Sequence, residues 1–374
     1  MKKLSIYLLT GLFTATALMY TGCNKKDDDN GNGNVLPGTF MVNIPDAISN
    51  PETSSKKSVT SKGDTVSGDE LYEHLTTFIY LGEESAKIVD AIINAISQYE
   101  INKAMSFNYT SDEDGREKEC VVIENASYEG VDYEFQMTIS DIQSKSNADG
   151  GKALQVFWNT SPIKGVAIIK PYNSNRNENI LLQNAMYRVD YSEAGENGYE
   201  KQMVIYITGL PTVSQDVWAI DKMKMFAGKK GDIIEVFGNS NHPNGMLFTQ
   251  DKGYTWAFSA AGDQVENIGV AEVGLPQNTV DATDRVTILE TNSMRNVLTD
   301  KISEWYLAEY GTPIDSAALA GYLAYSEAPG YFDSEHFVAA GTAPNSDYDV
   351  IESAMDALTP YNPNNINNLT IEFK

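Results

Sequence analysis

The chain has 374 residues, and 52 Asp and Glu against 27 Lys and Arg give it a formal net charge of −25 at pH 7. This acidity argues against binding nucleic acid, which needs Lys and Arg to neutralise phosphates, and against lying flat on an anionic membrane. The length suffices for one large domain or two ordinary ones.

The first 22 residues predict a secretory signal peptide. Met1, Lys2 and Lys3 make a positive end, the uncharged run LSIYLLTGLFTATALM follows, and small residues precede Cys23. This order is typical of a cleavable signal. The apolar run, residues 4–19, is shorter than the roughly twenty residues that an unkinked spanning helix needs. We therefore expect residues 1–22 to be removed, and no membrane-spanning helix.

The residues at the predicted cleavage site, Tyr20-Thr21-Gly22-Cys23, resemble the lipobox of bacterial lipoproteins. Tyr20 stands where that class usually has Leu. The resemblance implies that Cys23 becomes the first residue and carries a diacylglycerol and an amide-linked acyl chain such as palmitate. One acyl chain binds a membrane only marginally, with a constant on the order of 10⁴ M⁻¹, whereas two or more anchor a protein stably. The expected membrane contact is therefore the lipid on Cys23; an ordinary secreted protein is the alternative.

A short charged cluster follows the cysteine, formed by Lys25, Lys26, Asp27, Asp28 and Asp29. It resembles the acidic export signal that Bacteroidota place on lipoproteins bound for the outer leaflet of the outer membrane. This implies a lipid-anchored outer-membrane protein that faces the exterior, with the periplasmic face as the alternative. Residues 23–34 otherwise have the composition of a solvated tether.

The next segments predict a mainly β domain. Residues 35–68 contain a candidate first strand, Thr39–Ile44, followed by a polar linker. Apolar residues then recur at three- and four-residue steps from Asp69 to about Ile101, which predicts a long amphipathic helix. Residues 131–140, VDYEFQMTIS, alternate between apolar and polar in the manner of a half-buried antiparallel strand. The free thiol Cys120 lies in another strand-like run, KECVVIE, where we expect it to be buried and inert.

Further strand-like runs occur at 154–158, 165–172, 185–191, 202–207, 222–226, 232–237, 245–249, 254–259 and 285–290. Turn sequences such as NADGG and DKG separate them. We therefore predict an α+β fold that is mainly antiparallel β, a large curved sheet or barrel with a long N-terminal amphipathic helix, over residues 69–291.

Residues 292–374 predict a helical C-terminal region. Helical patterns occupy 293–310, 313–325 and 346–358, and the closing NLTIEF, residues 368–373, reads as a last strand returning to the sheet. We expect this region to pack on the same domain.

The stretch TQDKGYTW, residues 249–256, resembles the Asp-box hairpin of sialidase-like propellers. The matching residues are Thr249, Asp251, Gly253, Thr255 and Trp256. The resemblance implies that Asp251 accepts backbone hydrogen bonds across the turn, that Gly253 has a positive φ and that Trp256 anchors the second strand in the core. The motif occurs once and no 40- to 50-residue period accompanies it, so we predict a structural hairpin.

No motif identifies a catalytic residue, a cofactor or a metal site. The chain lacks a phosphate-binding glycine loop, HExxH and GxSxG. His74, His242 and His336 are far apart in sequence, which argues against a histidine-built zinc or haem site. Residues 333–336 and 346–349 contain oxygen ligands of the kind calcium uses, but solvated acidic loops are the simpler interpretation.

The leading hypothesis is a cell-surface protein that binds a glycan or protein partner without catalysis. The chain has 21 Tyr and 4 Trp, and these side chains suit sugar stacking and protein interfaces. The alternatives are an extracellular glycan hydrolase that uses carboxylates and a structural subunit of a surface assembly. Two facing carboxylates in a cleft would favour the hydrolase, and an aromatic-lined concavity without them would favour binding.

Overall fold

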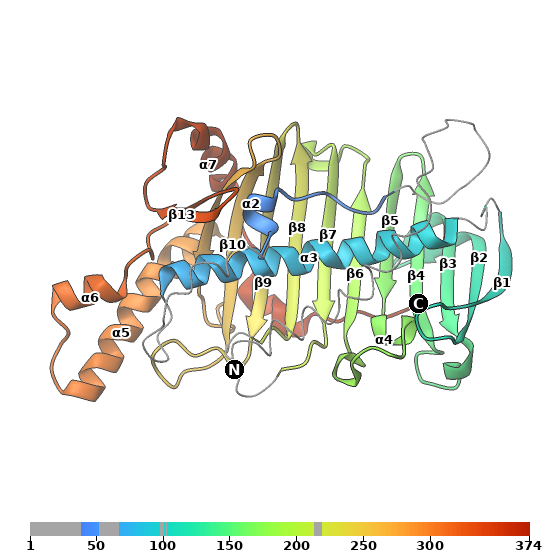
Figure 1. Ribbon diagram of the computed structural model, residues 1–374, viewed down its shortest axis with the longest axis horizontal. Helices are drawn as coiled ribbons and strands as arrows, with labels where there is room; N and C mark the ends of the chain where they lie inside the picture. Colours follow the sequence, from blue (N-terminus) through green and yellow to red (C-terminus); the bar gives the residue numbers. More distant parts are fainter. Residues whose placement is uncertain (1–38, 52–66, 98–100, 102, 213–218) are drawn as a thin grey trace. The chain divides into compact units, whose positions relative to one another are not determined.

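A computed structural model of the chain describes residues 39–51, 67–97, 101, 103–212 and 219–374 (Figure 1). The predicted signal peptide, Cys23 and the charged cluster at 25–29 lie outside the described residues. The described residues belong to two compact units, each assembled from distant parts of the chain. Of the described residues, the first unit takes those within 39–41, 84–211 and 370–374, and the second takes those within 42–83 and 212–369.

Antiparallel strands dominate both units, and within each unit the strands neighbour one another in chain order, from β1 to β7 and from β8 to β13. This confirms the prediction of an α+β fold that is mainly antiparallel β. In the first unit the strands are β1 (Met105–Thr110), β2 (Glu117–Tyr128), β3 (Val131–Asp141), β4 (Lys152–Thr160), β5 (Ile163–Ile169), β6 (Met186–Ser192) and β7 (Lys201–Thr208). In the second they are β8 (Lys222–Lys230), β9 (Ile233–His242), β10 (Tyr254–Asp263), β11 (Ile268–Gly274), β12 (Gly330–Asp333) and β13 (His336–Ala340).

Helical segments accompany the strands. The α-helices are α2 (Asp46–Ser49), α3 (Gly68–Ser97), α4 (Pro171–Ser174), α5 (Met294–Tyr310), α6 (Ser316–Tyr322) and α7 (Asp349–Asp356). Shorter 3₁₀ turns are η3 (Ile142–Ser144), η4 (Ile180–Leu182), η5 (Glu196–Gly198), η7 (Ser346–Tyr348) and η8 (Pro363–Asn368), and η6 (Val286–Thr291) is a π-helix. A helix with the length and hydropathy for crossing a membrane is not found in the described part of the chain.

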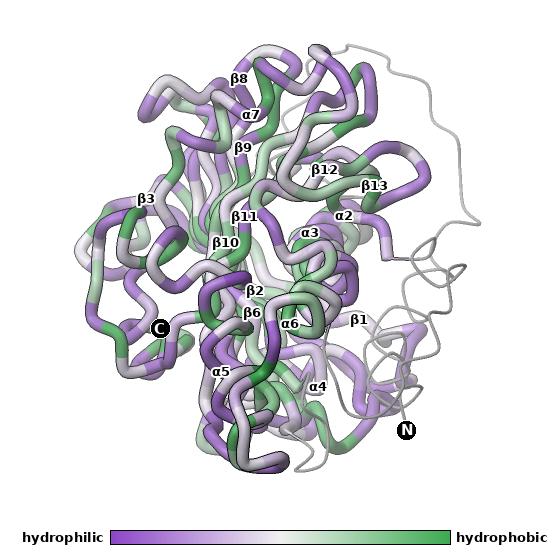
Figure 2. The backbone as a smooth tube through the Cα atoms, turned by 90° about the vertical axis from the view of Figure 1, so that its left-hand side faces the viewer, coloured by the Kyte–Doolittle hydropathy of each residue, from purple (hydrophilic) through white to green (hydrophobic). Residues whose placement is uncertain are grey.

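The core of the second unit lies where the first part of α3 packs on the sheet. The Phe78 ring lies 4.9 Å from the rings of His242 on β9 and Trp256 on β10. Gly82 brings the helix so close to β8 that an added Cβ would meet Met225 Cε at 2.4 Å. Hydrophobic stretches gather along β9 to β11, while many connecting loops are hydrophilic (Figure 2).

Three predicted strands are wrong. Thr39–Ile44 forms no strand, because carboxylates on α3 take its backbone N–H groups: Phe40 donates to Asp90 at 2.6 Å and Ile44 donates to Glu83 at 3.1 Å. Residues 245–249 form a bend between β9 and β10. Residues 285–290 fall largely in the π-helix η6, and Asp284, just before it, accepts from the Thr287 N–H at 2.7 Å.

The predicted last strand is wrong as well. Residues 363–368 form η8, and residues 369–374 have no regular structure. Within the first unit, side chains bind the end of the chain in place of a neighbouring strand. The Lys374 N–H donates to Gln155 Oε1 at 2.8 Å, and the Tyr128 hydroxyl donates to the Glu372 carbonyl at 3.1 Å.

At Gly330 on β12, the surrounding side chains leave no room for an added side chain. A Cβ there would meet Tyr72 Cε1 at 2.6 Å, and Tyr72 is fully buried with its hydroxyl bonded to the Glu327 carbonyl at 2.8 Å. We expect Gly330→Ala to reduce the free energy of unfolding by about 1–3 kcal/mol through overpacking, measured by urea denaturation.

Gly321→Ala is the matched control, because its added Cβ in α6 meets nothing within 4 Å. That change should be neutral or stabilising by up to about 1 kcal/mol, since Ala favours a helix over Gly. Equal urea midpoints for Gly330→Ala and Gly321→Ala would contradict the packing argument.

Candidate functional site

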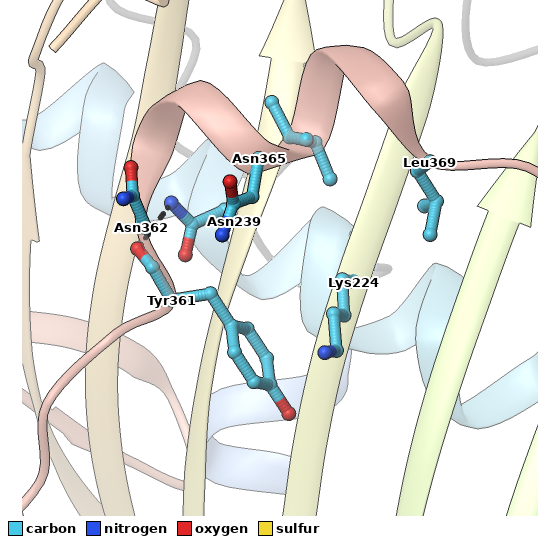
Figure 3. A pocket seen from close by; sticks show the side chains of 7 residues that line it. Lys224, Asn239, Tyr361, Asn362, Asn365 and Leu369 are labelled. Atoms are coloured by element: carbon cyan, nitrogen blue, oxygen red, sulfur yellow. Dashed lines mark hydrogen bonds between the residues drawn. The ribbon is translucent and has the colours of Figure 1, made fainter. Parts of the chain in front are cut away.

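The second unit contains a cavity of about 140 Å³ between its sheet and the segment 361–369 (Figure 3). Lys224 on β8 and Asn239 on β9 form the sheet side. The covering side is formed by Tyr361, Asn362, Asn365, Ile366 and Leu369. This volume is below the roughly 300–1,000 Å³ of pockets for drug-sized ligands. The cavity therefore suits a small molecule or the end of a chain.

Strand register brings the sheet-side residues together. Lys224 pairs with Asn239, and Lys222 pairs with Asn241. Residues directly opposite each other in antiparallel strands lie on the same face of the sheet. These four polar side chains therefore lie on the sheet face that segment 361–369 covers. The alternate residues of β8 and β9, including Met225 and His242, face α3 instead.

Side-chain hydrogen bonds to backbone carbonyls hold the covering segment. Asn239 Nδ2 donates to the Tyr361 carbonyl at 2.9 Å, and Lys222 Nζ donates to the Asn367 carbonyl at 2.6 Å. Asn367 Nδ2 donates in turn to the Asn278 carbonyl at 2.8 Å. The cavity wall is thus fixed at several points along its length.

The Tyr361 ring forms the aromatic part of the lining. Lys224 Nζ lies 4.0 Å from its centroid, a cation–π distance. Phe237 packs against the same ring at 5.2 Å, and Phe226 stacks on Phe237 at 4.8 Å. Figure 3 shows the amino end of Lys224 directed toward the Tyr361 ring.

The most informative atom of the site is Asn239 Oδ1. Asn239 is fully buried, and its bond to the Tyr361 carbonyl identifies which end of the amide is Nδ2. Oδ1 then has no hydrogen-bond partner among the described residues. An acceptor left in this way costs about 1–3 kcal/mol, and such groups in native proteins call for an explanation.

An ion-pair cluster lies elsewhere in the second unit, around Arg285. Its guanidinium donates to Glu272, to Asp356 at 3.1 Å, to Ser259 Oγ at 3.0 Å and to the Leu358 carbonyl at 3.0 Å. Burial raises the pKa of Glu272, and Arg285 opposes that rise. Both carboxylates bind one guanidinium, so this cluster is arranged to secure the chain after α7.

The Asp-box-like residues lie in and before β10. Thr255 and Trp256 are buried on β10, and Gly253 has φ +84°. Asp251 differs from the expectation: its backbone N–H contacts Thr249 Oγ1 at 3.4 Å, and its carboxylate accepts from Lys301 Nζ on α5 at 2.6 Å. Eleven residues, 243–253, separate β9 from β10, so Asp251 lies too far from a tight turn to bridge it.

The other residues singled out in the sequence occupy packed positions. His74 and His242, distant in sequence, both lie near Phe78, at ring distances of 6.2 and 4.9 Å. Within the residues that the structure describes, no group of three His, Cys, Asp or Glu side chains could hold a metal ion. Cys120 is buried as predicted, and burial raises the pKa of its thiol to about 12.

The sequence analysis missed the residues of the cavity. One signal was present: β9 contains NSN at 239–241, and asparagine is depleted in strands. Buried asparagines at alternate positions of a strand indicate that one face of the sheet makes polar contacts.

Comparison of the chain with protein-family models, curated proteins and solved structures gives no match. The function must therefore be inferred from the site.

The hydrogen bond from Lys222 to Asn367 should control how firmly the cavity wall is held. We expect Lys222→Met to speed hydrogen exchange of the amides of Asn364, Asn365 and Leu369 by roughly tenfold to a hundredfold, since a bond from a charged donor contributes about 1.5–3 kcal/mol. Hydrogen-exchange mass spectrometry measures this directly.

Lys229→Met serves as the control, because this lysine of the same strand donates to Gln264 instead. It should leave exchange in 364–369 unchanged. Equal exchange in both variants and the unmodified protein would show that Lys222 does not hold the wall.

Proposed function

We propose that this chain is a lipid-anchored protein of the outer-membrane surface that captures a small ligand without catalysis. The observation that carries the capture is the cavity of about 140 Å³ between segment 361–369 and the strands that present Lys224 and Asn239. A ring, amides, a lysine and apolar side chains line this cavity, and its lining contains no carboxylate. Such a set can hold a small molecule by apolar contact and hydrogen bonds.

The anchoring half of the proposal is supported by residues 1–29. They contain the signal-like start, the lipobox-like cysteine and the charged cluster. In this proposal the tether at 23–34 separates the ligand-binding unit from the lipid. The long N-terminal amphipathic helix and the helical C-terminal region belong to the scaffold that supports the site.

The proposed alternative is a glycan hydrolase that uses two carboxylates. Glu272 and Asp356 are two acids with one shared partner, Arg285. Burial raises the pKa of Glu272, as a general acid requires, but Arg285 binds both carboxylates in one ion-pair cluster. Cleavage of a bound glycan would favour this alternative. Self-association without any ligand would favour a structural subunit of an assembly.

Ligand capture predicts a thermal shift. We expect one class in a panel of oligosaccharides, peptides, haem and calcium to raise the melting temperature of the unlipidated full chain, Cys23→Ser. A ligand present at about 100 times its dissociation constant adds roughly 2.7 kcal/mol of stability. A panel without any shift would contradict small-ligand capture.

Lipid anchoring predicts a change of compartment. Cys23→Ser should abolish incorporation of radiolabelled palmitate and move the protein from the membrane fraction to the soluble fraction, because no acyl chain remains. Fatty-acid labelling and fractionation of cells measure both effects.

Replacing Asp27, Asp28 and Asp29 with Asn is the matched variant for surface export. This variant should still incorporate labelled palmitate. Protease added to whole cells should no longer cleave it, because it does not reach the surface. A wild-type protein that carries no label would refute the anchor, and unchanged protease cleavage in the Asn variant would refute the acidic export signal.

A further inference from the structure

We infer that the first unit binds an oxyanion between the guanidinium groups of Arg116 and Arg176. Arg116 stands directly before β2, and Arg176 follows the end of α4. Both arginines lie in the first unit, whereas the residues of the cavity lie in the second. The inference is therefore independent of ligand capture at the cavity.

The two guanidinium groups converge on one carboxylate at the end of β3. Asp141 Oδ2 accepts from Arg116 Nε at 2.9 Å and from Arg176 Nε at 3.3 Å. Ser144 Oγ accepts from Arg116 Nη2 at 3.2 Å and from Arg176 Nη2 at 2.8 Å. Because both arginines contact the same two oxygen atoms, their guanidinium groups are neighbours.

The two arginines carry one positive charge more than Asp141 can balance. Burial opposes ionisation of Asp141, but hydrogen bonds from Arg116 and Ser144 outweigh burial and hold the pKa of this carboxyl below its usual range. One negative charge therefore faces two positive charges. The other arginines of the chain each meet one or two carboxylates that they share with no second arginine; these are Arg188, Arg285 and Arg295. A bound anion would balance the surplus charge of the pair.

Each guanidinium keeps N–H donors that solvent reaches. Asp141 and Ser144 take Nε and Nη2 of both arginines, and Nη1 has no hydrogen-bond partner among the described residues. Neither Nη1 belongs to the buried side-chain atoms that lack a partner, so both are accessible. The side chains of Arg116 and Arg176 are 31% and 19% exposed, whereas that of Asp141 is 0% exposed. An anion from solvent can thus reach the cations but not the carboxylate.

A second carboxylate fixes the backbones of both arginines. Asp114 Oδ1 accepts from the Arg116 N–H at 3.1 Å, and Asp114 Oδ2 accepts from the Arg176 N–H at 3.0 Å. The buried Lys118 holds Asp114 in turn, at 2.9 Å from Nζ to Oδ2. The Tyr172 ring lies 4.7 Å from Arg176 Cζ. Donors that are held in place before a ligand arrives lose little freedom on binding.

The donors determine the class of ligand. Guanidinium N–H groups match the paired oxygens of carboxylates and phosphates, and sulfate has the same tetrahedral oxygens as phosphate. The net charge of −25 repels polyanions at long range. The ligand is therefore a small inorganic anion or a molecule with one anionic group, such as an acidic sugar.

The experiment uses the unlipidated full chain, Cys23→Ser, with its arginines labelled by ¹⁵N. The chain has five arginines, so substitution can assign each Nε signal. Phosphate, sulfate, acetate and glucuronate are added in turn, with glucose as the neutral control. At least one anion should shift the signals of Arg116 and Arg176 and leave the other three in place. Equal binding of acetate and glucuronate would assign recognition to the carboxylate alone, and tighter binding of glucuronate would assign it to an acidic sugar.

Arg116→Gln and Arg176→Gln each leave one guanidinium on the buried Asp141, so neither variant leaves that carboxylate without a cation. Calorimetry should show anion affinity falling by about tenfold or more in either variant, because charge-assisted hydrogen bonds are lost. Arg295→Gln is the matched control: it changes the net charge equally, but Arg295 pairs with Glu327 in the second unit. Anion affinity should stay within about twofold in this control, since the lost charge is remote and screened.

Two results would overturn the inference. If no anion moves the signals of Arg116 and Arg176, the pair has a structural role alone. If all five arginine signals move together, or Arg295→Gln weakens binding as much as Arg116→Gln, the effect is general screening of charge. If a variant does not fold, the signals of the unmodified arginines decide the outcome. Neither result bears on capture at the cavity, which the thermal-shift panel tests.

Discussion

The hydrogen bond from the buried Asn239 amide to the Tyr361 carbonyl is the interaction on which the site depends. It joins residues 122 positions apart in the chain. It holds the segment after α7 on the sheet and leaves the opposite end of the same amide as an unpaired acceptor. One side chain thus holds the cavity wall in place.

The same kind of hydrogen bond, between a side chain and the backbone, recurs where a segment runs beside the sheet without forming a strand. Buried backbone groups must find partners, and here side chains provide them: Asp90 for Phe40, Glu83 for Ile44 and Gln155 for Lys374. Burial raises the pKa of Asp90, and the two hydrogen bonds that it accepts from Phe40 and Thr39 oppose that rise. Segments with these partners need no strand pairing, which explains why apolar runs near both ends of the described chain are not strands.

Charged side chains make different kinds of contact in the two units. In the first unit Asp141 binds Arg116 and Arg176, and the fully buried Lys118 binds Asp114 at 2.9 Å. In the second unit Arg285 gathers two carboxylates, whereas the lysines of β8 at the cavity meet a carbonyl and a ring. The acid-rich chain therefore places amides, a ring and cations at its candidate site.

Local patterns were enough to predict part of this protein. The alternation at 131–140 lies in β3, and Cys120 is buried in β2, because period-two burial is a property of neighbouring residues. The antiparallel, mainly β class followed from many short strands and turns. Cys23 and residues 25–29 remain predictions from sequence. The cavity was decided by tertiary structure, since strand register places Asn239 opposite Lys224 and the returning segment brings Tyr361 to them. No local pattern encodes that meeting, because its energy comes from contacts between residues more than a hundred positions apart.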